Sequence, residues 1–385
     1  MRLLHTSDWH LGRSLHGQSQ LEAQAAFVEF LASVVRAEGI GAVVVCGDLY
    51  DRAIPPTEAV ELFDEALGRL AALQVPVVII SGNHDSPSRL GFGADLIAAS
   101  GVHLRTDPTG AGHPVVVADE HGDVAIYPLP YLEPELTWAA LAATAPRHEA
   151  VLVAAMQAVR ADAARRPAST RVVTMAHAFV AGARLAEASD SERDISVGGS
   201  PLVSASVFDG VHYAALGHLH RAQQPVAGRV TYSGSPVAYS FSEANDTKSV
   251  SIVDLGARGV SGIELLPCPV SRPLARLDGS LESFLTDPRW SRYEGHWLAV
   301  TLTDAEAPRD PMDRLRQRFP GVLQLTLTAR RGTAPGSYVE RLAGLDDVGV
   351  LSRFVEDMWQ RPPSAAELDL LRGGLEAERV REVSA

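Results

Sequence analysis

Cysteine is scarce in this sequence of 385 residues, and its scarcity excludes two kinds of stabilisation. The two cysteines, Cys46 and Cys268, stand in apolar surroundings more than two hundred residues apart. A disulfide framework and a zinc site built from thiolates are therefore both excluded. A chain without paired cysteines is typical of a reducing compartment, so we expect a cytoplasmic protein.

Long hydrophobic runs and a leader segment are also missing. The longest aliphatic stretches, such as residues 75–80, are far shorter than the roughly 20 residues that span a bilayer. After Met1 the chain enters a strand-like run at residues 3–5, with no charged leader, apolar segment or cleavage site before it. We therefore expect a soluble protein that is neither secreted nor inserted into a membrane.

Positive charge is in deficit as well. The chain has 34 lysines and arginines against 47 acidic residues, which gives a net charge of -13, and Lys248 is its only lysine. Nonspecific binding to nucleic acid usually depends on a broad basic surface. The charge balance argues against a passive nucleic-acid coat protein, but it does not exclude an enzyme that acts on nucleic acid.

Up to about residue 265, short apolar runs alternate with helical patterns, which predicts an α/β core. Helices are expected at residues 20–36, 59–73 and 141–164, and Pro55-Pro56 is a helix-start signal for the second of them. Strands are expected at residues 3–5, 42–46, 77–80, 124–127, 172–175, 213–216 and 249–253.

The last third of the chain has a different pattern. Prolines near residues 267–273 interrupt the core, and a unit of strand, helix, strand, helix and strand then ends near residue 329. A helical hairpin follows, in which Ser364 and Glu367 have the spacing of a capping box. We expect three domains, at residues 1–268, 269–335 and 340–385. The first tail helix carries one apolar stripe, made of Val350, Leu351, Phe354, Val355, Met358 and Trp359.

Five short polar motifs follow predicted strands, where an α/β sheet places the loops of its site. They supply imidazole, carboxylate and amide groups. Each motif alone is a weak signal; a lone histidine such as His177, for example, is usually a core residue. Because all five motifs follow predicted strands, a common site is the better interpretation. In chain order they are Asp8-Trp9-His10, Gly47-Asp48-Leu49-Tyr50-Asp51, Gly82-Asn83-His84-Asp85, His177 and Gly217-His218-Leu219-His220.

These motifs offer the ligands that a pair of divalent cations requires. Two ions held about 3.5 to 4 Å apart need a shared carboxylate and several oxygen and imidazole ligands. Mixed nitrogen and oxygen ligation without thiolate favours manganese, with iron, cobalt and zinc as alternatives. The remaining histidines have no such context, and we expect them to be core or surface residues.

Together, the five motifs resemble the signature of the calcineurin-like metallophosphoesterases. Residues 189–199 and 232–250 narrow the resemblance to the SbcD family, which contains the nuclease subunits of bacterial SbcCD complexes. The similarity covers the first 265 residues well, and the rest of the chain matches in size and order. It implies a four-layer α/β/β/α metallophosphoesterase core, a small α/β capping domain and a C-terminal helical hairpin.

The resemblance also implies roles for individual residues and two Mn²⁺ ions per chain. His84 is expected to face the scissile phosphate, where imidazole can stabilise the transition state or protonate the leaving oxygen. Asp85 is expected either to orient His84 or His10 by a hydrogen bond or to stabilise its turn. Asp51 stands where archaeal and eukaryotic relatives carry a histidine. The implied ligands are Asp8, His10 and His220 for one ion, Asn83, His177 and His218 for the other, and Asp48 as the bridge.

The activity that the resemblance implies is that of a DNA nuclease in repair, recombination and replication. It would be a 3′ to 5′ exonuclease on double-stranded ends and an endonuclease on single strands and hairpins. The ATPase SbcC would be its partner, in a heterotetramer of two plus two chains, bound by the tail through Phe354, Met358 and Trp359. Helices around residues 57–100 would form a homodimer.

Arg13, Arg52, Arg89 and Arg221 each follow a metal motif by a few residues. We expect them to contact DNA phosphates, with ordinary surface ion pairs as the alternative.

Two other functions fit parts of the pattern. A phosphomonoesterase or a small phosphodiesterase could use the same metals, although Ala53 and Asp85 depart from the motifs of phosphoprotein phosphatases. A scaffold that dimerises and recruits an ATPase would not need the complete ligand set.

Overall fold

The computed structural model describes residues 1–181, 202–328, 342, 344–359 and 361–383. Residues 1–328 form one compact unit, and residues from 329 onward belong to a second. Among the described residues, none of the helices has the length and apolar character needed to cross a membrane.

The first sheet contains six strands in the order β16-β15-β1-β4-β5-β6. Four of them run parallel, namely β1 (Arg2–Thr6), β4 (Ala42–Cys46), β5 (Val77–Ile80) and β6 (Val102–Arg105). The hairpin of β15 (Ser249–Gly256) and β16 (Gly259–Pro267) adds antiparallel to β1. The late β15 therefore closes the sheet beside the first strand of the chain.

The second sheet also has six strands, in the order β13-β14-β12-β9-β8-β7. Its parallel centre consists of β8 (Gly122–Leu129), β9 (Arg171–His177), β12 (Tyr213–Gly217) and β14 (Val230–Tyr232). The antiparallel edges are β7 (Val115–Asp119) and β13 (Gln223–Val226).

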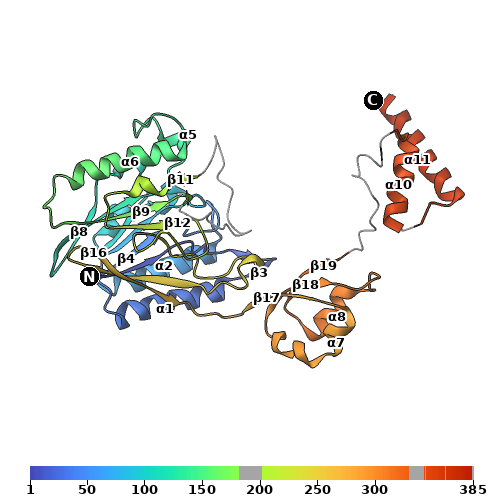
Figure 1. The fold of residues 1–385 in the computed structure, drawn as a ribbon, viewed down its shortest axis with the longest axis horizontal. Helices are drawn as coiled ribbons and strands as arrows, with labels where there is room; N and C mark the ends of the chain where they lie inside the picture. Colours follow the sequence, from blue (N-terminus) through green and yellow to red (C-terminus); the bar gives the residue numbers. More distant parts are fainter. Residues whose placement is uncertain (182–201, 329–341, 343, 360, 384–385) are drawn as a thin grey trace. The chain divides into compact units, whose positions relative to one another are not determined.

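The two sheets pack face to face, and helices cover their outer faces (Figure 1). On β4, Val43 and Val45 face the core under α1 (Leu21–Ala37) and α2 (Thr57–Ala71), while Val44 and Cys46 face the second sheet. This alternation arises because successive side chains of a strand point to opposite faces. Helix α6 (His148–Ala163) covers the second sheet, so the four-layer α/β/β/α prediction is confirmed.

Short elements complete this part of the chain. They are β2 (Ser14–Leu15), β3 (Gln18–Ser19), α3 (Pro87–Leu90), α4 (Ala94–Ala98), η1 (Pro108–Gly110), α5 (Pro134–Thr137), β10 (Val180–Ala181), β11 (Val203–Ser204), η2 (Ala205–Phe208) and η3 (Phe241–Glu243).

One predicted helix is shorter than expected. The prediction of a helix over residues 141–164 was wrong at its start, because α6 begins at His148. Pro146 explains the difference, since proline disfavours helical geometry in the residue before it. Ala142 has a φ of 53°, which also breaks the helix upstream. The strands β6, β7, β13, β14 and β16 were not predicted, nor were the two-residue strands β2, β3, β10 and β11.

A buried arginine links the two sheets. Arg171 is fully buried at the start of β9 and pairs with Asp119 through both terminal nitrogens. It also donates to the carbonyls of Gly122, at 2.7 Å, and Leu255 of the other sheet, at 3.5 Å. The Arg171 hydrogen bonds hold the pKa of Asp119 well below its usual range.

Replacing Arg171 with methionine is expected to lower the free energy of unfolding by about 1 to 3 kcal/mol, because Asp119 loses its two hydrogen bonds to Arg171 but keeps the amino terminus of Met1, 2.8 Å from Oδ2. Urea denaturation at neutral pH measures the loss. The folded-state pKa of Asp119 is depressed, so the pair stabilises the fold above the ordinary carboxyl pKa of about 3.9. The difference between variant and wild type should therefore shrink as the pH falls into the acid range.

The control for this prediction is Arg165→Met, which removes an arginine that is 75% exposed and pairs with Asp162. An exposed pair of this kind contributes at most about 1 kcal/mol. Equal losses in the two variants would contradict the role assigned to Arg171.

Within the first unit, residues 274–327 have a sheet and a core of their own. Strands β17 (Leu274–Gly279), β18 (Trp297–Leu302) and β19 (Val322–Leu327) are parallel. Helices α7 (Leu281–Thr286) and α8 (Pro311–Arg318) alternate with them, and η4 (Pro288–Tyr293) follows α7. The predicted order of strand, helix, strand, helix and strand is confirmed.

The second unit contains a helical hairpin, as predicted. Helix α10 (Asp347–Trp359) precedes α11 (Ala365–Val383). The capping box is present: the Ser364 amide donates to the Glu367 carboxylate at 2.7 Å, and the Glu367 amide donates to the Ser364 hydroxyl at 3.4 Å. Phe354 and Met358 on α10 are 52% and 65% exposed, whereas the side chain of Trp359 lies outside the described residues.

Candidate metal centre

The five motifs meet where the parallel strands of both sheets end. In the first sheet β1, β4 and β5 run in the same direction, and in the second sheet β9 and β12 do. Their carboxyl ends therefore lie at one edge of each sheet, and packing the sheets together brings the two edges into contact. The main-chain amide of Asp8 donates to the Gly47 carbonyl, and that of His10 to the Asp48 carbonyl, which joins the first two loops.

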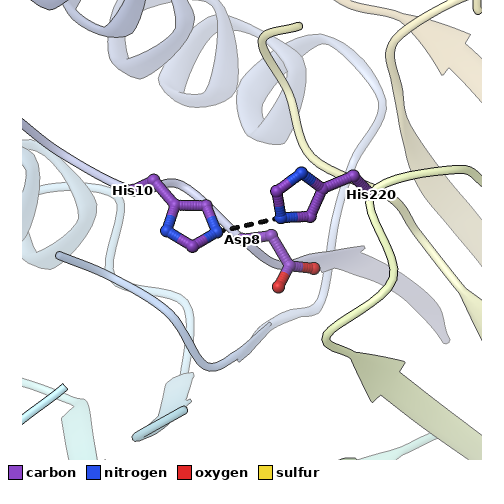
Figure 2. Close-up of side chains that lie close together, drawn as sticks. All are labelled: Asp8, His10 and His220. Atoms are coloured by element: carbon purple, nitrogen blue, oxygen red, sulfur yellow. Dashed lines mark hydrogen bonds between the residues drawn. The ribbon is translucent and has the colours of Figure 1, made fainter. Parts of the chain in front are cut away.

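One group of buried side chains consists of Asp8, His10 and His220 (Figure 2). The Nε2 atoms of His10 and His220 are 3.0 Å apart, and one ligand atom from each residue lies within 4.8 Å of the others. Asp8 accepts hydrogen bonds from the Ser7 hydroxyl and from the His218 amide. Two residues that follow β1 and a third about two hundred positions later therefore direct one carboxylate and two imidazoles at one point.

Asn83, His177 and His218 form the neighbouring group. The amide oxygen of Asn83 lies 2.9 Å from Nε2 of His177 and 3.3 Å from Nδ1 of His218. Nδ1 of His177 donates to the Cys46 carbonyl at 2.8 Å, so Nε2 is the nitrogen directed into the centre. Nδ2 of Asn83 is buried and has no hydrogen-bond partner among the described residues, so within this group the amide oxygen is the engaged atom.

Asp48 lies between the two groups. Its Oδ2 atom is 3.7 Å from Nε2 of His10 and 3.5 Å from Nε2 of His177, one histidine from each group. Its Oδ1 atom accepts a hydrogen bond from the His84 amide at 2.9 Å. A carboxylate in this position has the geometry that a shared ligand of two cations requires.

The backbone at the ligands is strained. Asp8, His10, Asp48 and His218 have φ values of 56°, 46°, 52° and 107°. Residues other than glycine rarely adopt positive φ, and such strain persists only where the surrounding structure holds it. In this protein it directs the side chains at the ends of β1, β4 and β12 into one centre.

Two glycines allow the loops to approach one another. A Cβ atom on Gly82 would come within 2.1 Å of the Asp48 carboxylate, and one on Gly217 would come within 1.9 Å of the Cys46 carbonyl. Any side chain at either position would separate the loops that carry the ligands.

The electrostatics of the centre fit a bound cation. Burial raises the pKa of Asp8 to about 8 against the opposing effect of His177. Burial also acts to raise the pKa of Asp48, but His177 and His10 outweigh it and hold the pKa well below its usual value. Burial lowers the pKa of His218 to about 3. Burial acts to lower the pKa of His177, but Asp48 outweighs this effect and raises the pKa to about 9. A divalent cation would replace the protons on Asp8 and His177 and stabilise this set of oxygen and nitrogen donors.

His84 is half-buried and oriented by backbone groups. Its Nδ1 atom donates to the Asp51 carbonyl at 2.7 Å, so Nε2 is the nitrogen that remains for a substrate. Its ring packs edge-on against His10, with 4.7 Å between centroids. His84 also offers a ring nitrogen within 4.8 Å of His10 and Asp48, so it belongs to the same cluster as the predicted ligands.

Asp85 does not contact either imidazole that it was expected to orient. Its carboxylate accepts hydrogen bonds from the amides of Leu49, Tyr50 and Gly82, at 3.1, 2.9 and 2.9 Å. It therefore joins the Asp48 loop to the Asn83 loop, which is the turn-stabilising alternative extended to a second loop. Burial, with a further contribution from Asp48, raises the pKa of Asp85 to about 6.

Three buried residues near the ligands were missed in the sequence. Gln24 of α1 donates to the His10 carbonyl at 2.8 Å and accepts from the Gly12 amide at 3.0 Å. Glu243 and Lys248 form a buried ion pair beside His220. The signal was available for these two, because both lie in residues 232–250 and Lys248 is the only lysine.

The four arginines near the motifs differ in exposure. Arg52 is 78% exposed and lies 3.6 Å from Asp51, and Arg89 is exposed and donates to the Ala53 carbonyl. Arg13 pairs with Asp51 at 3.2 Å and is only 17% exposed. Arg221 pairs with Asp246 at 3.1 Å and is 37% exposed.

Two further sequence observations have different outcomes. The motif at residues 189–199 lies outside the described residues. His5, expected to be a core or surface histidine, is fully buried between the Tyr213 hydroxyl and the Leu216 carbonyl, and burial lowers its pKa to about 3.

Comparison with known families assigns this centre to a class. Residues 1–222 match the model of the calcineurin-like phosphoesterases, which spans more than half of the chain. The chain therefore belongs to the calcineurin-like phosphoesterase family, whose members are metal-dependent. Residues 270–358 match the SbcD C-terminal domain model, described as the type 5 capsule protein repressor C-terminal domain. The two matches in this order support an SbcD-type nuclease.

Solved structures resemble the chain more distantly. The crystal structure of TT1561 from Thermus thermophilus is 15% identical, with a TM-score of 0.40 over 69% of this chain and 98% of its own. Another crystal structure is 12% identical, with a TM-score of 0.38 over 70% of this chain and 99% of its own. The family assignment rests on the sequence matches.

Proposed function

We propose that the protein is a Mn²⁺-dependent DNA nuclease of the SbcD type. It would act as a 3′ to 5′ exonuclease on double-stranded ends and as an endonuclease on single strands and hairpins. The observation that carries the proposal is the convergence of Asp8, His10, Asp48, Asn83, His177, His218 and His220 at the ends of five strands from two sheets. The match to an SbcD C-terminal domain favours DNA over a small phosphate ester.

The residues divide into binding, bridging and proton-transfer roles. Asp8, His10 and His220 would hold one ion, Asn83, His177 and His218 the other, and Asp48 both. When bound, the two cations supply an activated water and neutralise charge on the attacked phosphate. His84 would present Nε2 to the scissile phosphodiester, because its Nδ1 donates to the Asp51 carbonyl. As the imidazolium, with a proton on each ring nitrogen, it would give the Nε2 proton to the departing 3′ oxygen and be left as the neutral ring.

Cleavage of labelled DNA tests the proposal against its two rivals. The wild-type protein, with Mn²⁺, is assayed on hairpin and linear DNA and on a chromogenic phosphomonoester. Cleavage of DNA with little monoester hydrolysis is expected. Monoester hydrolysis alone would favour a phosphatase, and inactivity even with SbcC present would favour a scaffold.

Arginines at the rim would bind the DNA backbone. Replacing Arg13, Arg52, Arg89 and Arg221 with glutamine is expected to weaken DNA binding and to reduce its salt dependence by about 0.9 in slope for each phosphate that the variant no longer neutralises. Titrations of labelled DNA at several salt concentrations measure the slope. We expect Arg52 and Arg89 to account for most of the loss, because they are the exposed members of the set.

Arg69→Gln is the matched control for these variants, because Arg69 is 41% exposed and pairs with Glu65 on α2. Unchanged binding and slope in the fourfold variant would refute the proposed phosphate contacts.

The C-terminal hairpin would bind SbcC. Deletion of residues 345–385 is expected to abolish copurification with SbcC and to leave Mn²⁺ binding unchanged, because the predicted ligands belong to the other unit. Within the full chain, serine at Phe354 and Met358 is expected to weaken the complex, since these apolar side chains are exposed on α10. Leu370→Ser, an exposed leucine of α11, is the control. An intact complex after the deletion would refute this role.

A homodimer is proposed through the segment around residues 57–100. Exposed apolar side chains support it: Ile54 is 71%, Phe92 85% and Leu96 83% exposed. Apolar groups so exposed are typical of interaction surfaces. Sedimentation of the purified protein should give twice the mass of the chain, and Phe92→Ser with Leu96→Ser should give the single mass. A single mass for the wild type would refute the proposal.

A further inference from the structure

A buried ion pair lies directly behind His220. Glu243 is the last residue of η3, and Lys248 immediately precedes β15. Both are buried, with 1% and 7% of their surface exposed, and the Lys248 ammonium contacts the Glu243 carboxylate. Residues of these types are rarely so deeply buried without a specific reason.

The pair contacts His220 at two places. Lys248 Nζ donates to the main-chain carbonyl of His220 at 2.9 Å and to the Ser235 hydroxyl at 3.0 Å. Glu243 Oε1 lies 3.6 Å from Nδ1 of the His220 ring. The lysine therefore positions the backbone of His220, and the glutamate faces the side of the ring that points away from His10.

This arrangement determines which ring nitrogen of His220 is unprotonated and directs its lone pair toward the centre. A carboxylate beside Nδ1 keeps the proton on that nitrogen, and Nε2 is then free to donate electrons. Nε2 is the atom that lies 3.0 Å from Nε2 of His10. His177 differs, because its Nδ1 donates to the neutral carbonyl of Cys46. An anionic partner makes an imidazole a stronger ligand than a neutral one does.

A purely structural role explains the pair poorly. Burying two charges costs about as much free energy as their attraction returns, so apolar side chains of similar size would serve the fold equally well. The contacts to His220 provide a reason for the charges.

We propose that Glu243 and Lys248 are positioning residues of the metal centre, which fix the ring and backbone of His220 and so strengthen binding of the ion held by Asp8, His10 and His220. The inference rests on the metal centre of the proposed function and is independent of its substrate.

Mn²⁺ binding to the full-length protein tests the proposal, followed by the electron paramagnetic resonance signal of free Mn²⁺. In Glu243→Gln, one of the two binding steps is expected to weaken about 10- to 100-fold, the range for losing the partner of a ligating histidine, while the other step is unchanged. His220 belongs to only one ligand group, which is why one step should respond.

The double variant Glu243→Gln with Lys248→Met separates positioning from stability. Glu243→Gln alone leaves a buried lysine without its charged partner and should lower the urea midpoint. The double variant has no unpaired charge, so its urea midpoint should return most of the way to the wild-type value. Mn²⁺ affinity at the affected step should stay low in the double variant. Recovery of affinity together with stability, or wild-type affinity in Glu243→Gln, would overturn the proposal.

Arg171→Met is the matched control, because it breaks a buried ion pair at the opposite end of β9 from His177. It is expected to lower the urea midpoint and leave both Mn²⁺ steps unchanged. Weakened Mn²⁺ binding in this control would count against the proposal. Failure of the wild type to bind Mn²⁺ would overturn the proposed function itself, whereas normal wild-type binding with unaltered variants would overturn only this inference.

Discussion

Asp48→Asn is expected to reduce Mn²⁺-dependent DNA cleavage by at least about a thousandfold. Asp48 is the carboxylate within reach of a histidine from each ligand group, and its other oxygen accepts the His84 amide. Asparagine in its place offers one neutral amide oxygen, whereas the centre uses both oxygens of a charged carboxylate. Cleavage of end-labelled DNA measures the activity, and titration with Mn²⁺ should show that both binding steps weaken.

The control for this prediction is Asp209→Asn, which makes the same change from carboxylate to amide at an exposed position paired with Arg229. Its cleavage rate should equal that of the wild type. Near-normal cleavage by Asp48→Asn, with both Mn²⁺ ions still bound, would show that Asp48 is not a shared ligand and would remove the basis for a two-ion mechanism.

His84→Gln is expected to slow DNA cleavage by about 10² to 10⁴, the range for loss of a general acid, without a matching loss of Mn²⁺ binding. The reason is geometric: Nδ1 is held by the Asp51 carbonyl, which leaves Nε2 as the only ring nitrogen that can face a leaving oxygen. Single-turnover cleavage with saturating Mn²⁺ measures the chemical step.

A substrate with a better leaving group makes this prediction sharper. A p-nitrophenyl ester of a nucleotide releases an anion that needs no proton, so His84→Gln should slow its hydrolysis far less than it slows DNA cleavage. Equal losses on both substrates would mean that His84 stabilises charge on the phosphate instead of protonating the leaving oxygen. A loss of Mn²⁺ binding in this variant would make His84 a ligand.

The core of the fold was predictable because its signals are local. The apolar run at β4 and the helical spacing at α1 each lie within one segment, and both predictions agree with the structure to within a residue or two. The edge strand β13 was missed because it lacks an apolar run, whereas β7 was missed although its residues 115–118 are all apolar. The predicted start of α6 was wrong because Pro146 disfavours helical geometry in the residue before it.

For the candidate site, the member residues were predictable from the sequence, but not the role of every residue. Residue types at strand ends were enough to nominate every member of the buried cluster, including His84. The role of Asp85 was left open between two alternatives, because the partners of a carboxylate depend on which loop comes to lie beside it. Its hydrogen bonds to Leu49 and Tyr50 cross from one strand end to another.

The amino-acid sequence by itself determined the chemistry of this protein: imidazoles, carboxylates and an amide at the ends of buried strands, without thiolate. Only the tertiary structure decided how each group is held. Glu243 and Lys248 reach His220, Gln24 reaches the His10 loop, and the Asp51 carbonyl reaches His84. Ligand types follow from residue identity, but these hydrogen bonds join segments whose proximity exists only once two sheets and their helices have packed.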